Sequence, residues 1–263
     1  MTLTEPLAGT QAPLVVTDDG PLRLLTLNRP AVRNAIDLAT ALAIEAAIDE
    51  YEARSDLRAL IITGAGGTFC AGMDLKAFLR GERPSTQRRG FAGLVELPPT
   101  KPVIAAVEGQ AVAGGFEIIL ACDLIVAADN AWFALPEVKR GLVAAGGGLL
   151  RLPHRLPFQR AVELALTGER LQAVDAERYG LVNRLTTPGQ ALTGARALAE
   201  LVAANGPLAV AATKQILHES RHWPAAEAFH RQRELSEPVR RSDDAREGAR
   251  AFLEKRAPVW NGN

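Results

Sequence analysis

Short apolar runs separated by polar turns divide the first half of the chain into strands and helices. LRLLTLNRP (22–30), LRALIITG (57–64) and KPVIAAVEG (101–109) are each typical of a buried strand. Between the first two, apolar residues recur at helical spacing over LATALAIEAAIDEYEAR (38–54), where Asp37 is placed to cap the helix. GGFEIILACD (114–123) indicates a buried helix, although its apolar run also fits a strand. This alternation predicts an α/β domain.

The second half of the chain is dominated by helical periodicity. LIVAAD (124–129) and AWFAL (131–135) still indicate short strands, but helical spacing follows in FQRAVELALTG (158–168) and QAVDAERYG (172–180). From Pro188 to the end we expect helices broken at Gly206-Pro207, Pro224 and Pro238. We therefore predict an α/β core over residues 1–200 and a helical region over 201–263. The first dozen residues are expected to form a loose arm, and LRGERPSTQRRG (79–90) a mobile loop.

The composition favours a globular protein that works without nucleic acid or a membrane. The 263 residues are 48% hydrophobic and 23% charged, and 30 Lys and Arg balance 30 Asp and Glu. A balanced charge predicts neither nucleic acid nor an anionic membrane as partner. Two cysteines are too few for a disulfide framework, and neither a signal peptide nor an apolar run of membrane-spanning length is visible. We expect a cytoplasmic location.

Several common catalytic motifs are absent from the chain. There is no Gly-x-Ser-x-Gly, and in GAGGTF the third glycine of a dinucleotide fingerprint falls on Phe69. No Gly-Lys-Ser/Thr follows either glycine cluster, so a phosphate-binding P-loop is unsupported. The four histidines lack metal-ligand spacing, and Cys70 has no histidine nearby in sequence. We interpret Cys70 as a partly buried packing thiol and predict no metal site.

Two glycine turns and two glutamates remain as candidate chemistry. FCAGMDL (69–75) offers an exposed N–H near Met73, and Gly114 begins a helix after a second glycine turn. Unpaired N–H groups at such places suit a developing oxyanion, and each donor is worth about 3–4 kcal/mol in measured oxyanion holes. Glu117 lies on the first turn of that helix, and Glu137 follows Pro136. A glutamate in an apolar setting can exchange protons near neutral pH. Each feature alone also fits ordinary packing or helix capping; their combination carries the hypothesis.

These segments resemble the crotonase superfamily, the enoyl-CoA hydratase/isomerase group, over nearly the whole chain. The similar segments include LNRPAVRNAID, FCAGMDLK, KPVIAAVEGQAVAGGFEIILACDLIVAADNAWFALPEVKRGLVAAGGG, ALTGERLQAVDAERYGLVNRL and EGARAFLEKRAPVW. The resemblance implies the α/β crotonase (ClpP/crotonase-like) fold of repeated ββα units with a helical C-terminal trimerisation region. It also implies a homotrimer or a dimer of trimers.

The resemblance assigns roles to the four candidate residues. The backbone N–H groups of Met73 and Gly114 match the family's oxyanion-hole donors. Glu117 and Glu137 match its two catalytic glutamates, which hold one water for syn addition to a 2-enoyl-CoA. Glu117 then acts as the base at the water, and Glu137 supplies or removes the proton at C2. No metal or redox cofactor is required, and coenzyme A enters as part of the substrate.

Further positions match the family's coenzyme A contacts. The nucleotide pocket is expected along Ala31, Val32 and Arg33. Two positions of the oxyanion loop also match coenzyme A contacts of the family. Two positions of the C-terminal helix match residues that reach the coenzyme A of a neighbouring subunit. These four residues are Ala71, Asp74, Phe252 and Lys255.

The presence of both glutamates favours hydration and dehydration over the other reactions of the family. Isomerases usually keep only the counterpart of Glu137. ADNAWFALPEVKRGLV, LLRLPHRLP and EKRAPVWNG especially resemble the carnitinyl-CoA dehydratase branch, which is a second hypothesis within hydration chemistry. Leu135 and Phe116 depart from common fatty-acid hydratases. An enoyl-CoA isomerase and a non-catalytic acyl-CoA-binding protein are two further hypotheses that the sequence leaves open.

Overall fold

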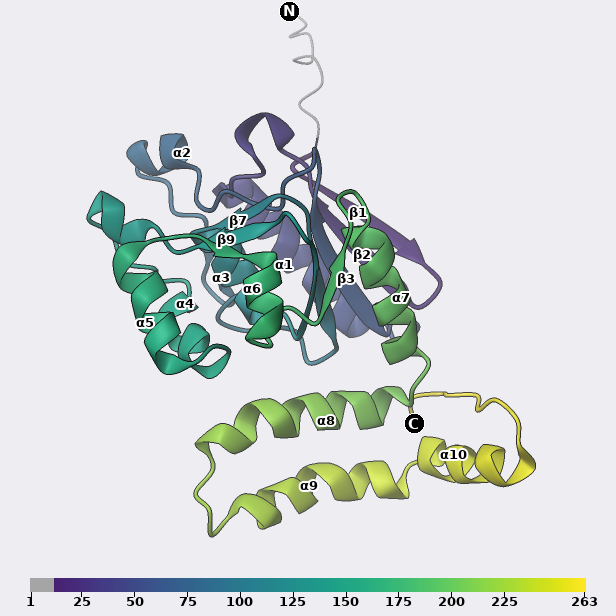
Figure 1. Ribbon diagram of the computed structural model, residues 1–263. Helices are drawn as coiled ribbons and strands as arrows, with labels where there is room; N and C mark the ends of the chain where they lie inside the picture. The colour runs from purple at the N-terminus through teal and green to yellow at the C-terminus, as the bar shows by residue number, and fades with distance from the viewer. Residues whose placement is uncertain (1–11) are drawn as a thin grey trace, which may run out of the picture.

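A six-stranded sheet lies at the centre of the computed structural model, which describes residues 12–263 (Figure 1). Its strand order is β1-β2-β3-β6-β8-β11, and every neighbouring pair is parallel except β1 and β2. The strands are Leu14–Asp19 (β1), Leu22–Leu27 (β2), Ala59–Gly64 (β3), Val103–Val107 (β6), Leu124–Ala128 (β8) and Arg184–Thr186 (β11). The expected loose arm falls almost entirely on residues 1–11, outside the described residues.

Two small sheets flank the large one. The first has the order β10-β9-β7, and the second is a hairpin of β4 and β5. Their strands are Gln110–Val112 (β7), Trp132–Ala134 (β9), Leu171–Gln172 (β10), Ser85–Thr86 (β4) and Gly90–Phe91 (β5). The sequence analysis predicted β9 but missed the other four, each of which is only two or three residues long.

The α-helices cover both faces of the sheet and continue into the C-terminal region. They are Leu38–Ala53 (α1), Leu75–Leu79 (α2), Gly114–Ala121 (α3), Gly148–Arg151 (α4), Phe158–Thr167 (α5), Ala173–Arg178 (α6), Ala191–Ala203 (α7), Pro207–Glu219 (α8), Ala228–Arg241 (α9) and Asp243–Glu254 (α10). Single 3-10 turns are Pro30–Val32 (η1), Glu137–Arg140 (η2), Leu152–His154 (η3) and Ser220–His222 (η4). The ambiguous run at 114–123 is therefore mostly helix. Within residues 12–263, no helix combines the length and apolarity needed to cross a membrane.

The parallel pairing brings three loops to one edge of the sheet. Leu27 at the end of β2 pairs with Gly64 at the end of β3, and β6 continues the parallel array. The segments that follow these strands therefore emerge side by side. In open α/β sheets, ligands bind beyond the carboxyl ends of parallel strands. This edge is where the candidate site is built.

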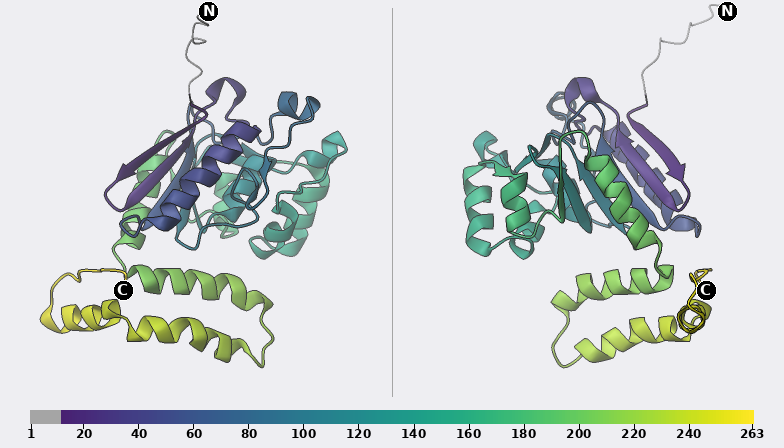
Figure 2. Two further views of the ribbon diagram at one scale, coloured as in Figure 1. Left: turned by 180° about the vertical axis from the view of Figure 1, so that it is seen from behind. Right: turned by 45° about the vertical axis from the view of Figure 1, so that its right-hand side comes forward.

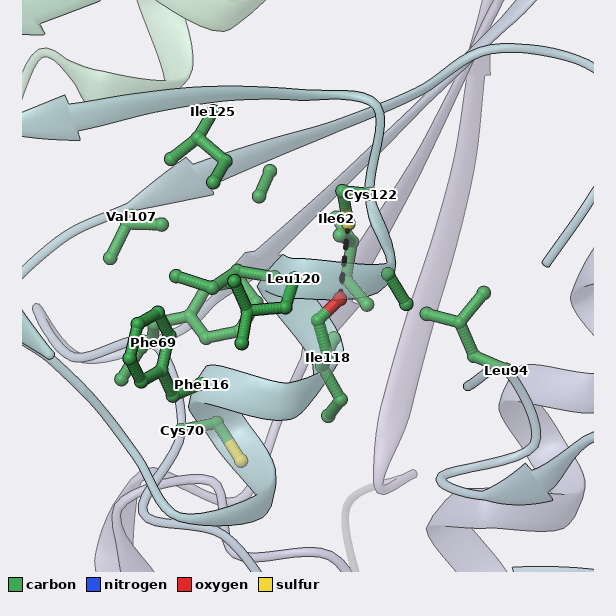
Figure 3. Packing of buried hydrophobic residues seen from close by; sticks show 14 of the residues in the cluster. Ile62, Phe69, Cys70, Leu94, Val107, Phe116, Ile118, Leu120, Cys122 and Ile125 are labelled. Atoms are coloured by element: carbon green, nitrogen blue, oxygen red, sulfur yellow. Dashed lines mark hydrogen bonds between the residues drawn. The ribbon is translucent and has the colours of Figure 1, made fainter. Parts of the chain in front are cut away.

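The two faces of the sheet carry different cores. The larger cluster contains α1, α3 and the aromatic pair Phe116 and Phe133, whose ring centroids are 5.3 Å apart. Figure 3 shows Phe69, Phe116 and Cys70 close together within this cluster. On the other face α7 packs through small residues, because Ala195, Ala199 and Ala203 recur along one side of it.

The last three helices form a C-terminal arm, defined here as α8 to α10, that lies beside the core as a separate layer (Figure 2). Gly206 precedes Pro207 at the start of α8, as the sequence analysis expected for a break. Asp123 of the core holds the arm, since its carboxylate accepts from Lys214 Nζ at 2.7 Å and lies 3.0 Å from His218 Nε2. Trp260 donates through Nε1 to Ala204 O at 2.7 Å and so ties the chain's last segment to the end of α7.

Two local expectations differ from the structure. Pro238 was expected to break a helix but lies inside α9, which continues to Arg241. The missing N–H matters little there, because Pro238 is exposed and water can reach the carbonyl it leaves unpaired. The segment 79–90 is also more anchored than a mobile loop, since buried Arg89 pairs with Asp49 at 2.8 Å.

Candidate active site

The Met73 N–H is left free by the way its neighbours pair. Ile36 N–H donates to Gly72 O at 2.8 Å, and Asp74 N–H donates to Ile36 O at 2.9 Å. This single parallel bridge uses the groups on either side of Met73 and leaves its own N–H facing away from Ile36. Over residues 12–263, no backbone or side-chain acceptor takes that hydrogen.

The second amide, that of Gly114, is exposed by an abrupt turn at Ala113. Ala113 donates to Ala134 O at 2.9 Å, and its φ of 52° and ψ of −127° direct the chain from β7 into α3. Gly114 is the first residue of the helix, so its N–H has no partner inside the helix. Within the described residues it also has no other acceptor.

The two turns lie against each other. A Cβ added at Gly72 would be 3.0 Å from Gly114 N and 2.9 Å from Val112 O, and Gly72 has a φ of +92°. Val112 N–H donates to Cys70 O at 2.9 Å, which extends β7 alongside the Met73 turn. Only glycine fits at position 72, for reasons of both space and backbone conformation. Met73 and Gly114 consequently face one cavity.

This cavity has a volume of about 420 Å³ and contains both candidate glutamates. That volume lies in the range of small-molecule sites. Its apolar lining comes mainly from α2, β5 and the segment after η2. The lining residues include Ala71, Met73, Leu75, Phe78, Arg83, Phe91, Glu96, Gly114, Glu117, Glu137, Arg140, Leu142, Val143 and Gly146.

Glu117 is a buried carboxyl group held by backbone amides. It is only 4% exposed, and its Oε1 accepts from Gly148 N–H at 2.9 Å. Burial raises the pKa of Glu117 above its usual value, while the amides of Gly148 and Gly146 and the charge of Arg151 oppose the rise. Gly146 is required by space, since a Cβ there would lie 2.5 Å from Oε2.

Glu137 enters the cavity from the first turn of η2. Its Oε2 is buried and has no hydrogen-bond partner within the described residues. Burial raises the pKa of Glu137 to about 7, and the negative charge of Glu117 adds to the rise. The backbone amide of Glu137 itself and the charge of Arg140 act in the opposite direction. A carboxyl group of this kind can both give and take a proton near neutral pH.

The structure places the predicted coenzyme A contacts in three different settings. Ala71 lines the cavity, and its N–H donates to Arg33 O at 3.0 Å. Arg33 ends η1 in the left-handed region with a φ of 53°, and Ala31 and Val32 beside it are exposed. These three exposed residues therefore border the Met73 turn without lining the cavity.

The Asp74 carboxylate bonds to backbone amides of α2 and to Arg29 and does not line the cavity. Its carboxylate caps α2 by accepting from Lys76 N and Ala77 N, and it pairs with Arg29 at 2.9 Å. These bonds keep the pKa of Asp74 below its usual value against the opposing effect of burial. A contact with coenzyme A at this position stays a prediction.

Phe252 and Lys255 are not brought to the cavity of their own chain. Both lie at the end of α10, where Phe252 is 83% exposed and Lys255 closes the helix with a φ of 54°. Figure 1 shows α10 in the arm, away from α2 and α3. A role toward a neighbouring subunit remains the prediction for these two residues.

Sequence reasoning missed the side chains that support the Met73 turn. Asn34 is 1% exposed, and its Nδ2 donates to Ala65 O and Thr68 O, each at 2.9 Å. The signal was an Asn inside RNAID, but its role depends on contacts across about 30 residues of chain. The glycine cluster at 146–148 carries no local signal for its role, yet the amides of two of these glycines hold Glu117. Cys70 is fully buried, and burial raises the pKa of its thiol to about 12, which fits a packing role.

The fold and this cavity together bring two unpaired backbone amides close to two carboxyl groups whose pKa values are raised. The family model of enoyl-CoA hydratase/isomerase matches residues 19–263, so the chain belongs to that family. The predicted crotonase fold is confirmed by the solved structures to which the chain is similar.

Individual relatives point in two directions within the family. The carnitinyl-CoA dehydratase of Salmonella typhi is 45% identical over 257 residues, covering 95% of this chain and 98% of that protein. The solved enoyl-CoA hydratase of Mycobacterium tuberculosis H37Rv is 52% identical with a TM-score of 0.95, covering 96% of this chain and all of that one. A carnitinyl-CoA hydratase structure from Mycobacterium avium is 43% identical with a TM-score of 0.78, covering 97% and 100%.

Proposed function

We propose that the chain catalyses reversible syn addition of water to the double bond of a 2-enoyl-CoA thioester. The observation that carries this proposal is the pairing of Glu117 with Glu137 in one cavity with two free amides. A single carboxyl group suffices to shift a double bond. Two carboxyl groups with raised pKa values can bind one water molecule, and one of them can accept its proton while the other donates a proton to the substrate.

The thioester oxygen accepts hydrogen bonds from Met73 N–H and Gly114 N–H in the proposed reaction. Negative charge grows on that oxygen as water attacks C3, so the two amides stabilise the enolate more than the ground state. Each such donor typically contributes about 3 kcal/mol to lowering the barrier. Neither amide has to break a bond within the described part of the chain to do so.

Glu117 takes one proton from water as the oxygen of water bonds to C3. The electron pair of the double bond moves toward C2 and the thioester oxygen. Glu137 in its protonated form then gives a proton to C2, and the carbonyl double bond re-forms. The product has gained a hydroxyl group at C3 and a hydrogen at C2, Glu117 has gained one proton and Glu137 has lost one. A proton returns from Glu117 to Glu137 through solvent to close the cycle.

Addition of water involves no net oxidation or reduction, and the proposal includes neither a metal nor a redox cofactor. Coenzyme A is part of the substrate. We also keep a cytoplasmic location and a homotrimer or dimer of trimers as proposals. Strongly exposed apolar side chains on the arm support assembly: Phe252 is 83%, Leu253 80% and Phe229 74% exposed.

Dehydration of carnitinyl-CoA is the second candidate function, favoured by the 45% identity to a carnitinyl-CoA dehydratase. It uses the same residues in the reverse direction on a different acyl group. Loss of enoyl absorbance, measured with crotonyl-CoA, tests the main proposal. Binding of the thioester without water addition would favour a non-catalytic carrier, and migration of a 3-enoyl double bond without water uptake would favour an isomerase.

A further inference from the structure

The carboxylate of Glu117 and the guanidinium of Arg151 both lie against the glycine turn at 146–148. A Cβ added at Gly146 would lie 2.5 Å from Glu117 Oε2, and one added at Gly147 would overlap Arg151 Nη1. These two glycines are consecutive, and consecutive Cα atoms are only about 3.8 Å apart. One short turn therefore contacts a negative group and a positive group.

Arg151 fixes this turn through its main chain and its side chain. Its N–H donates to Gly147 O at 3.0 Å at the start of α4, while Nη2 of its side chain donates to Val95 O at 2.5 Å. Gly148, the next residue of the turn, donates its N–H to Glu117 Oε1 at 2.9 Å. Arg151 thus links the segment after β5 to the turn that holds the Glu117 carboxylate.

The guanidinium of Arg151 has no carboxylate bonded to it. Within residues 12–263 it forms no ion pair, and Val95 O is the acceptor of its side-chain hydrogen bond. Burial lowers the pKa of Arg151, and the negative charge of Glu117 opposes this fall. Burial raises the pKa of Glu117, and the positive charge of Arg151 opposes that rise. Each group therefore favours the charged form of the other.

The other charged groups near Glu117 come from the walls of the cavity. Glu117 is the one charged residue of α3, and β7, which packs against α3, has none. The cavity is also lined by the charged residues Arg83, Glu96, Glu137 and Arg140. Glu137 responds to the charge of Glu117, which raises its pKa, but among the described residues it is the charge of Arg151 that lowers the pKa of Glu117.

We propose that Arg151 is a positioning residue for Glu117, which holds the 146–148 turn against the carboxylate and supplies the positive charge that favours its ionised form. This inference rests on the proposed function, in which Glu117 must be ionised to take a proton from water. Without the guanidinium, a larger fraction of Glu117 is protonated at a given pH. Activity then falls on the acidic side of the pH profile, because the protonated form cannot act as a base.

The pH profile of kcat/KM for crotonyl-CoA hydration separates the charge of Arg151 from its position. Arg151→Met removes the charge and should move the acidic limb of the profile upward by about one unit. Arg151→Lys keeps the charge but loses the planar fork, so the limb should stay in place while kcat falls severalfold. An acidic limb moved equally by both variants would contradict the role of the charge.

Arg155→Met is the matched control. Arg155 is also a half-buried arginine that donates to a backbone carbonyl, Cys122 O at 2.6 Å, but its charge does not act on Glu117. The control should lose a similar packing contact and leave the acidic limb where it is. A general loss of folded enzyme lowers the height of a profile without moving its limbs, so a destabilised variant does not imitate the effect.

Carbon-13 NMR of protein labelled at the glutamate side-chain carboxyl carbons measures the same titration without turnover. The Glu117 signal is the one that Glu117→Gln removes. Its midpoint should rise by about one unit in Arg151→Met and stay unchanged in Arg155→Met. An unmoved midpoint in Arg151→Met, or an equal shift in Arg155→Met, would overturn the role of Arg151. A midpoint that moves as expected in a chain that hydrates no enoyl thioester would remove the proposed function and leave the link between Arg151 and Glu117 intact.

Discussion

Arg29 and Asp74, 45 residues apart in the chain, form an ion pair at 2.9 Å that supports the Met73 turn. Arg29 also donates to Ala35 O at 2.5 Å and contacts Asp37 at 2.9 Å, so one guanidinium joins the loop after β2 to the residue following Met73. The pair contacts neither Glu117 nor Glu137, yet it fixes the segment that presents the free Met73 N–H.

Asp74→Asn should therefore lower kcat about tenfold while changing KM little. Asparagine still caps α2, so the effect isolates the ion pair from the cap. A misplaced catalytic group loses rate steeply with distance. Infrared spectroscopy of a bound thioester labelled at its carbonyl carbon would report a weaker hydrogen bond as a shift of the stretching band to higher frequency.

Arg29→Lys should resemble Asp74→Asn, since lysine keeps the charge but loses the fork geometry. The double variant should lose less than the product of the two single effects, because both remove one interaction. Full additivity, or an unshifted carbonyl band, would contradict a positioning role. Thermal unfolding of each variant separates this role from a general loss of stability.

The hydration rate should fall as pH rises through about 7. Glu137 must be protonated to give its proton to C2, and its pKa is raised to about 7 mainly by burial. The profiles of kcat/KM for hydration and for dehydration should both bend down there, because both directions use the form of the enzyme that carries one proton on the glutamate pair. A hydration profile that is flat between pH 6 and 8, with about one unit allowed on either side of the pKa, would contradict this assignment.

Stability should also depend on pH, between 4.5 and about 7. Because the folded pKa of Glu137 lies above its unfolded value of 4.5, the folded state binds the extra proton between these two values. The contribution of Glu137 to the free energy of unfolding is therefore highest below pH 4.5, and it falls as pH rises toward 7. Glu137→Gln should remove this slope and also reduce turnover by orders of magnitude. Denaturant titrations at a series of pH values measure the difference.

Gly72→Ala should abolish most activity, with Gly20→Ala as its matched control. Both glycines have a positive φ, but a Cβ at Gly20 meets nothing within 4 Å, whereas one at Gly72 meets the Gly114 turn. The control should cost about 1 kcal/mol of unfolding free energy and leave kcat unchanged. The Gly72 variant should lose at least a hundredfold in kcat. Equal effects would show that crowding between the turns is unimportant.

Lys255→Gln tests the predicted contact with a neighbouring subunit's coenzyme A. If Lys255 binds a phosphate, KM for crotonyl-CoA should rise severalfold, while KM for crotonyl-pantetheine, which lacks the nucleotide, should not change. Analytical ultracentrifugation should show a trimer or hexamer. A monomeric protein with normal coenzyme A dependence would exclude this role.

Sequence patterns predicted the elements whose residues signal their state locally. Asp37 at the start of α1 and the apolar run of β3 are such cases, and each lies where periodicity and capping placed it. The short strands β7 and β10 have too few residues for a period and are defined by partners far along the chain. Pro238 shows the reverse, because its effect depends on exposure that sequence does not reveal.

The residues of the candidate site also differ in whether a local sequence signal predicts their role. Glu117, Glu137 and the two glycine turns were visible as residue types in turns, and the cavity contains all of them. The roles of Arg29, Asn34 and Gly146 were not visible, because each acts through a contact between distant segments. Periodicity and spacing describe one segment at a time and carry no information about such contacts.

The β4–β5 hairpin lines the cavity through Phe91 and is anchored to α1 by the pair of Arg89 and Asp49 at 2.8 Å. The hairpin is fastened to α1, whereas the proton-exchanging carboxyl groups are fastened to α3, η2 and the glycines after η2. Exchange of residues 85–96 for those of a relative is therefore expected to change which acyl groups the cavity accepts. Such an exchange leaves Glu117, Glu137 and the segments that hold them unchanged.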